Sequence, residues 1–80
     1  MNDKKAISLT EMRAGRSGII LHLHGGSAFV SRLQALGLRP GKRVTKVSSM
    51  VMHGPTTVQV DGTQIALGFG MASHIIVQTD

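Results

Sequence analysis

One stretch of this chain decides the fold, Arg32-Leu33-Gln34-Ala35-Leu36-Gly37-Leu38-Arg39-Pro40-Gly41. Its leucines recur at helical spacing, and Gly37 suits the left-handed position that commonly ends a helix. Leu38 can then pack back on Leu33, as in a Schellman ending, and Pro40 cannot continue the helix. The stretch therefore predicts the end of a short helix, a tight turn and the start of a strand.

The helix that ends here follows the Gly25-Gly26 break, and Ser27 is placed to cap its first turn with its hydroxyl. Phe29 and Val30 extend the apolar spacing of the stretch backwards by one turn. We therefore predict one helix over about residues 27–37. A further helical or 3₁₀ turn is expected near residues 71–74.

The rest of the chain is typical of short β-strands separated by glycine turns. Alternating or β-branched residues predict strands over 19–24, 43–49, 56–60, 63–67 and 75–77. Asp61-Gly62 joins two of these as a type I′ hairpin turn. In the strand over 43–49 we expect the valines Val44 and Val47 to be the apolar residues.

A mostly β chain with one inserted helix predicts a small SH3-like five-stranded barrel, with the OB-fold as the nearest competitor. Eighty residues make one domain. We expect residues 1–6 to be a flexible N-terminus and residues 7–80 to form the single domain. One exposed edge of such a barrel could pair with a second copy, so a homodimer stays open.

Composition narrows the class of function. The formal net charge is +5, which suits an acidic partner or nucleic acid, but two Phe with no Tyr or Trp offer few stacking platforms for bases. The chain has no cysteine, so thiolate metal sites and disulfides are excluded. No apolar run is long enough for a signal peptide or a membrane span. We expect a cytoplasmic protein that is not embedded in the membrane, with no nucleic acid favoured.

A series of motifs spans nearly the whole chain. In chain order they are Ile7-Ser8-Leu9-Thr10-Glu11-Met12, Ala14-Gly15-x-x-Gly18, Arg32-Leu33-x-x-Leu36-Gly37-Leu38-x-Pro40-Gly41, Gly54-Pro55, Val58-x-Val60-x-Gly62-x-x-Ile65-Ala66-Leu67 and Ala72-x-x-Ile75-x-Val77. Together they resemble ferrous iron transport protein A (FeoA). The same fold recurs as the C-terminal domain of iron-dependent repressors of the diphtheria-toxin-repressor type.

The resemblance implies an accessory protein of ferrous iron uptake that interacts with the membrane permease FeoB, through its cytoplasmic GTP-binding part, and modulates it. This chain departs from the family pattern at two positions. Gly68 stands where a basic residue is usual, and Lys46 stands where an apolar residue is usual. No required cofactor is implied.

A docking surface is the site that the leading function needs. An apolar centre with a basic rim would give both affinity and orientation. We expect it to include the turn after the helix and the loop at residues 50–53, and its candidate residues are Leu36, Leu38, Arg39, Arg43, Met50 and Met52. The sequence contains no catalytic constellation, so we do not expect an enzyme.

Two alternative functions remain. His22 and His24 lie on one face of a strand and could bind a transition metal, Fe²⁺ or Zn²⁺, if His53 or Asp80 supplied a third ligand. The other interpretation of this pair is a solvated outer strand face. A small basic RNA-binding barrel is the second alternative, with Arg39, Lys42, Arg43 and Lys46 as its densest basic run.

Overall fold

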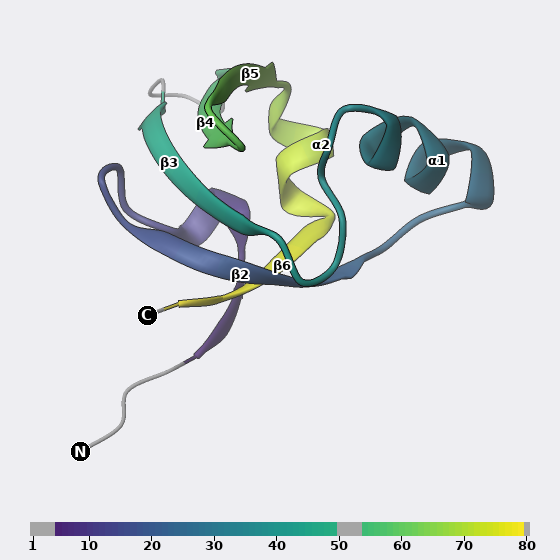
Figure 1. The fold of residues 1–80 in the computed structure, drawn as a ribbon, viewed down its shortest axis with the longest axis horizontal. Coiled ribbons are helices and arrows are strands. Elements are labelled where there is room, and N and C mark those ends of the chain that lie inside the picture. The colour runs from purple at the N-terminus through teal and green to yellow at the C-terminus, as the bar shows by residue number, and fades with distance from the viewer. Residues whose placement is uncertain (1–4, 50–53, 80) are drawn as a thin grey trace.

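The computed structural model describes residues 5–49 and 54–79, which form one strongly bent antiparallel sheet with short helical segments between its strands (Figure 1). Within these residues the sheet has six strands in the order β1-β6-β2-β3-β4-β5. Their bounds are β1 Ala6–Ser8, β2 Ser17–Leu23, β3 Arg43–Ser49, β4 Thr56–Val60, β5 Thr63–Leu67 and β6 Ile75–Thr79.

Three helical segments connect the strands. The 3₁₀ helix η1 spans Leu9–Glu11 after β1, α1 spans Ser27–Ala35 between β2 and β3, and α2 spans Phe69–Ser73 between β5 and β6. The mostly β architecture with a short inserted helix is therefore confirmed. The turn expected near residues 71–74 is α2, which begins earlier, at Phe69.

The ends of α1 follow from its flanking glycines. Gly26, and not Ser27 as expected, is the N-cap residue, and its carbonyl accepts from the Val30 N–H at 3.0 Å. At the other end, Leu38 N–H donates to Leu33 O and Gly37 N–H donates to Gln34 O, both at 3.0 Å. Gly37 has a φ of 96°, so the predicted Schellman ending is confirmed.

The hairpin of β4 and β5 has the turn that its sequence predicts. Asp61 and Gly62 have φ values of 51° and 79°, the positive pair that a type I′ turn requires. The register then runs from Val60 opposite Thr63 to Thr56 opposite Leu67. The predicted bounds of both strands agree with the structure.

The sheet has one strand more than the five expected. Ala6, expected within the flexible N-terminus, pairs with Gln78, and Ile7 pairs with Val77. The sequence offers only three residues here, and their alternation is too short to indicate a strand. β1 is an edge strand of the sheet, next to β6, and β5 is the other edge strand.

The core draws on every helical segment and on strands β2 to β6. All its members are 3% exposed or less, and they are Leu9, Met12, Ile20, Leu33, Leu38, Val44, Val58, Val60, Leu67, Ala72, Ile75 and Val77. The helical segments therefore close the bent sheet against a single apolar cluster. A chain of this length has little core to spare, so each buried position matters to its stability.

Register shifts occur in two of the strand pairings. The register of β2 against β6 shifts between Ile20 and His22, so Ile20 is buried whereas His22 is exposed. The register of β3 against β4 shifts between Lys46 and Ser48. Before that shift, side chains alternate along β3, so Lys46 is buried on the same face as Val44 and Val47 is 39% exposed, which reverses the expected placement of Val47.

Candidate functional site

The basic run over residues 39–46 does not form one cationic face. Arg39 and Arg43 are exposed, and Lys42 forms an ion pair with Asp61 at 2.8 Å. Lys46, expected in the same run, is only 2% exposed. The structure thus removes Lys46 from the surface and leaves the two arginines as the exposed cations that flank the turn after α1.

Lys46 instead occupies a cage of backbone oxygens. Its Nζ donates to the carbonyl oxygens of Leu9 at 3.1 Å, Thr10 at 3.2 Å and Met12 at 2.6 Å. An ammonium group has three protons, so these three acceptors satisfy it completely. Burial lowers the pKa of the Lys46 amine from its ordinary value of 10.5.

The cage fixes the N-terminal segment onto β3. Lys46 also bonds through its own backbone, accepting from Gly15 N–H at 2.6 Å and donating to Arg16 O at 2.9 Å. On the far side of η1, Ser8 N–H donates to Glu11 Oε1 at 3.1 Å, which is half of a capping box. The chain from Leu9 to Arg16 is therefore held to β3 at several points.

The predicted docking residues separate into surface and core. Leu36, at the C-cap of α1, is 43% exposed, and Arg39 and Arg43 are exposed near it in sequence. Leu38 is fully buried, because the Schellman ending folds it back on Leu33. Its inclusion in the surface was wrong. Met50 and Met52 lie outside the described residues.

Sequence reasoning missed the exposed side chain of Phe69. Phe69 is the first residue of α2 and is 38% exposed, and it precedes the turn expected near residues 71–74. α1 and α2 touch through Phe29 and His74, whose rings meet edge to face with centroids 5.3 Å apart. Two neighbouring helices thus each present one exposed apolar residue.

His22 and His24 lie together on the outer side of β2, as expected. Both are exposed, and their ring centroids are 6.0 Å apart. Within residues 5–49 and 54–79, no group of three potential metal ligands comes together. The suggested third ligands, His53 and Asp80, lie outside the described residues.

Comparison with known proteins identifies the family. The FeoA domain model matches residues 7–79. The chain belongs to the FeoA family. An iron uptake regulatory protein (FeoA) is 32% identical and superposes with a TM-score of 0.89 over 95% of this chain and 100% of that one. FeoA proteins are associated with ferrous iron transport, and this domain is not known as an enzyme.

Two more solved structures extend the comparison. FeoA of Stenotrophomonas maltophilia, a prokaryotic SH3 domain protein solved with zinc, is 29% identical, with a TM-score of 0.73 over 89% of this chain and 88% of that one. This likeness confirms the SH3-like fold. The T. acidophilum protein IdeR is 23% identical and shares the fold, with a TM-score of 0.82. The match covers 100% of this chain and 37% of the IdeR chain. No curated protein matches.

Within the described residues, no helix has the length and apolar character of a membrane span.

The cage predicts a specific cost of losing the Lys46 ammonium. We expect Lys46→Met to lower the free energy of unfolding by about 2 kcal/mol, because buried carbonyls left without donors cost about 1–3 kcal/mol. Urea denaturation followed by circular dichroism measures the change. Lys42→Met is the matched control, since an exposed ion pair contributes about 1 kcal/mol or less. Equal losses in the two variants would contradict the cage.

Proposed function

We propose that this protein acts in the cytoplasm as a non-catalytic partner of a FeoB-like ferrous iron permease. It binds the GTP-binding part of the permease and modulates transport. Membership of the FeoA family supports the role in iron uptake. The observation that supports binding is the exposed Leu36 at the end of α1, in a chain with little core to spare.

Leu36 has the surroundings of an interface residue. An exposed leucine that is not needed for the core is free to fill a pocket on a partner. Arg39 lies in the turn after the helix and donates from Nε to Gln34 O at 3.4 Å, which directs its guanidinium near the end of α1. Arg43 begins β3 at the other end of the same connection. An apolar centre with cations at its rim suits an acidic protein surface.

The positive charge of the chain supports the same partner. A formal net charge of +5 favours encounter with an acidic domain and makes that encounter sensitive to salt. Lys42 is paired with Asp61, and we expect Arg39 and Arg43 to orient the acidic partner. We call Leu36, Arg39 and Arg43 the α1 surface.

Binding of the purified GTP-binding part of the permease tests this function. We expect Leu36→Gln to weaken the affinity about tenfold or more, since loss of a central apolar contact costs more than about 1.4 kcal/mol. Biolayer interferometry on the full-length chain measures it. Val47→Gln, on β3, is the control, because Val47 is 39% exposed against 43% for Leu36.

The control decides whether the α1 surface is the contact. Val47→Gln should bind as the unmodified chain does, while Arg39→Glu should bind more weakly and lose part of the salt dependence. Absence of binding by the unmodified chain would refute the function. Equal weakening by Leu36→Gln and Val47→Gln would refute the surface.

Zinc binding by His22 and His24 is the second candidate function. Two imidazoles that share one tetrahedral ion have ring centroids about 5 Å apart, since Zn–N distances are about 2.0–2.1 Å. The observed 6.0 Å therefore needs only a small side-chain rotation, which exposed rings can make. The zinc complex of the Stenotrophomonas maltophilia FeoA favours the same chemistry.

Calorimetric titration of tag-free protein with Zn²⁺ tests the pair. We expect His22→Ala to abolish the binding heat or weaken the affinity about tenfold or more, because two ligands hold the ion where one does not. His74→Ala is the control, since His74 is also exposed but lies outside the pair. Unchanged binding by His22→Ala would exclude this site.

A further inference from the structure

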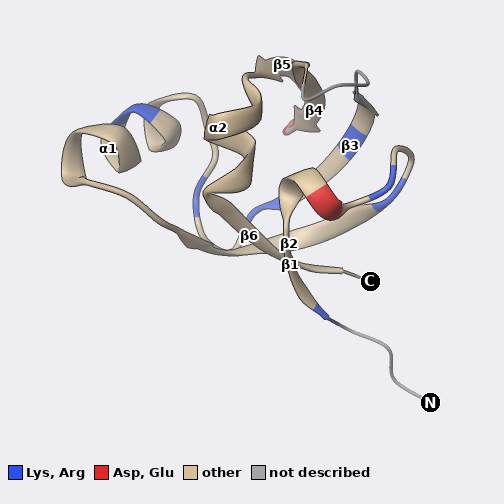
Figure 2. Ribbon diagram, turned by 180° about the vertical axis from the view of Figure 1, so that it is seen from behind, with Lys and Arg blue, Asp and Glu red and all other residues tan. Residues whose placement is uncertain are grey.

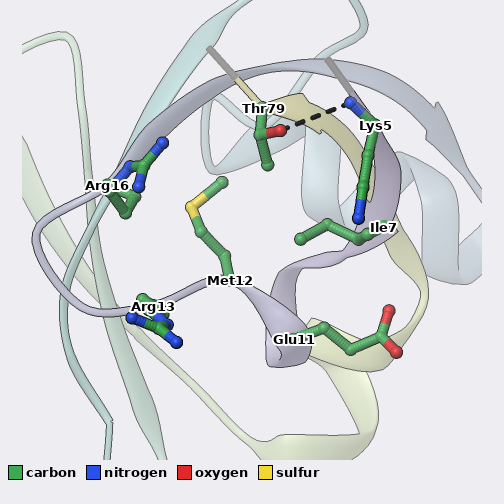
Figure 3. Close-up of a pocket in the computed structure, with 7 residues that line it drawn as sticks. All are labelled: Lys5, Ile7, Glu11, Met12, Arg13, Arg16 and Thr79. Carbon is green, nitrogen blue, oxygen red and sulfur yellow. Dashed lines mark hydrogen bonds between the residues drawn. The ribbon is translucent and has the colours of Figure 1, made fainter. Parts of the chain in front are cut away.

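A pocket of about 320 Å³ opens between β1, the loop after η1 and the end of β6 (Figure 3). We call it the N-terminal pocket, and its lining includes Ile7, Met12 and the cations Lys5, Arg13 and Arg16. We propose that this pocket binds an extended acidic segment of a partner protein. An apolar side chain of the segment fills the floor, and its carboxylates meet the basic rim.

The floor of the pocket is apolar and adaptable. Met12 is 3% exposed and belongs to the core cluster, and Ile7 is half-buried against the same cluster. Figure 3 shows the two side chains in the middle of the pocket, between the charged residues. A thioether on an unbranched chain adjusts to the shape of its partner, so the floor suits an aliphatic or aromatic side chain.

The rim favours negative charge. Arg13 and Arg16 stand on one side of the pocket and Lys5 on the other, and all three are exposed (Figure 3). Among the lining residues that the structure describes, Glu11 is the one acid, and its Oε1 already accepts from Ser8 N–H. Three cations against one acid attract carboxylates, and guanidinium groups bind them in a bidentate manner.

The shape of the site favours an extended peptide. A volume of about 320 Å³ is at the lower end for ligand pockets, so it accepts one or two side chains and no folded domain. β1 is an edge strand of the sheet, so a peptide segment can lie along it in extended form. Because side chains two positions apart share a face of such a segment, an apolar anchor with a carboxylate two residues before it and another two residues after it turns all three toward the pocket.

RNA and a metal ion fit the pocket poorly. Its lining, over residues 5–49 and 54–79, offers no aromatic side chain on which a base could stack. Metal ions would meet three cations and one partly engaged carboxylate. An acidic segment with an apolar anchor therefore matches both the floor and the rim, whereas RNA matches only the rim.

The pocket is formed before any ligand arrives. Lys46 Nζ holds the carbonyl of Met12 at 2.6 Å, and Lys46 O accepts from Gly15 N–H. On the other side, Thr79 N–H donates to Lys5 O at 2.9 Å. Walls fixed in this way lower the ordering cost of binding. The pocket is separate from the α1 surface, so the proposal does not depend on the permease as partner.

Fluorescence anisotropy tests the pocket with a short labelled peptide in which one leucine has a glutamate two residues before it and another two residues after it. We expect Arg13→Glu to weaken binding about tenfold or more, since a charge reversal at a rim contact also repels the ligand. Arg32→Glu makes the same charge change on α1, which lies on the opposite side of the molecule from β1 (Figure 2). It should bind within about twofold of the unmodified chain.

Peptide variants separate the floor from the rim. A peptide with serine in place of leucine should bind about tenfold more weakly, because the apolar anchor is lost. Equal binding of the two peptides, or equal weakening by Arg13→Glu and Arg32→Glu, would reduce the interaction to general charge attraction and overturn the proposal. Absence of binding by the leucine peptide would overturn it too, and tighter binding of a single-stranded RNA at the same site would assign the pocket to RNA.

Discussion

The contact of Lys46 Nζ with three carbonyl oxygens organises one end of this molecule. A charge buried to this degree is tolerated only when its donors are satisfied, and the carbonyls of Leu9, Thr10 and Met12 supply that. These oxygens belong to η1 and the residue after it; Leu9 O also accepts from Met12 N–H at 3.3 Å, and the carbonyls that follow it lie at the end of the helix, where intrahelical donors run out. The Lys46 ammonium group and the carbonyls at the end of η1 therefore satisfy each other's hydrogen bonds.

The position of this lysine follows from the alternation of side chains along β3. The alternation that buries Val44 also turns Lys46 inward and Val47 outward. With Lys46 inside, the loop after η1 lies close enough to bond Gly15 N–H to Lys46 O. That loop carries Met12 and Arg13 into the N-terminal pocket. The pocket and the anchor are thus parts of one arrangement, while the α1 surface is built separately at the end of α1.

Local rules recovered the parts of the fold that local chemistry determines. The ending of α1 and the Asp61-Gly62 turn were predicted because a glycine at positive φ leaves a clear signal. The burial of Lys46 was not predicted, because a lysine is rarely buried and the carbonyls that bind its ammonium group come from residues 9–12, far away in the sequence. The sequence does show Lys46 at a position where the family usually has an apolar residue. That departure was the signal that this side chain could be buried. Of the docking residues, Leu36 fits a surface, but Leu38 was misplaced because one residue cannot both close the helix and face a partner.

The pKa of the Lys46 amine tests most directly whether this group is buried among the three carbonyls. Heteronuclear NMR of the full-length chain can follow the side-chain carbon next to Nζ while the pH is raised. The account predicts a titration midpoint below the ordinary pKa of 10.5, because burial disfavours the charged form. A midpoint at 10.5, together with rapid exchange of the ammonium protons with water, would place the amine in solvent and contradict the anchor.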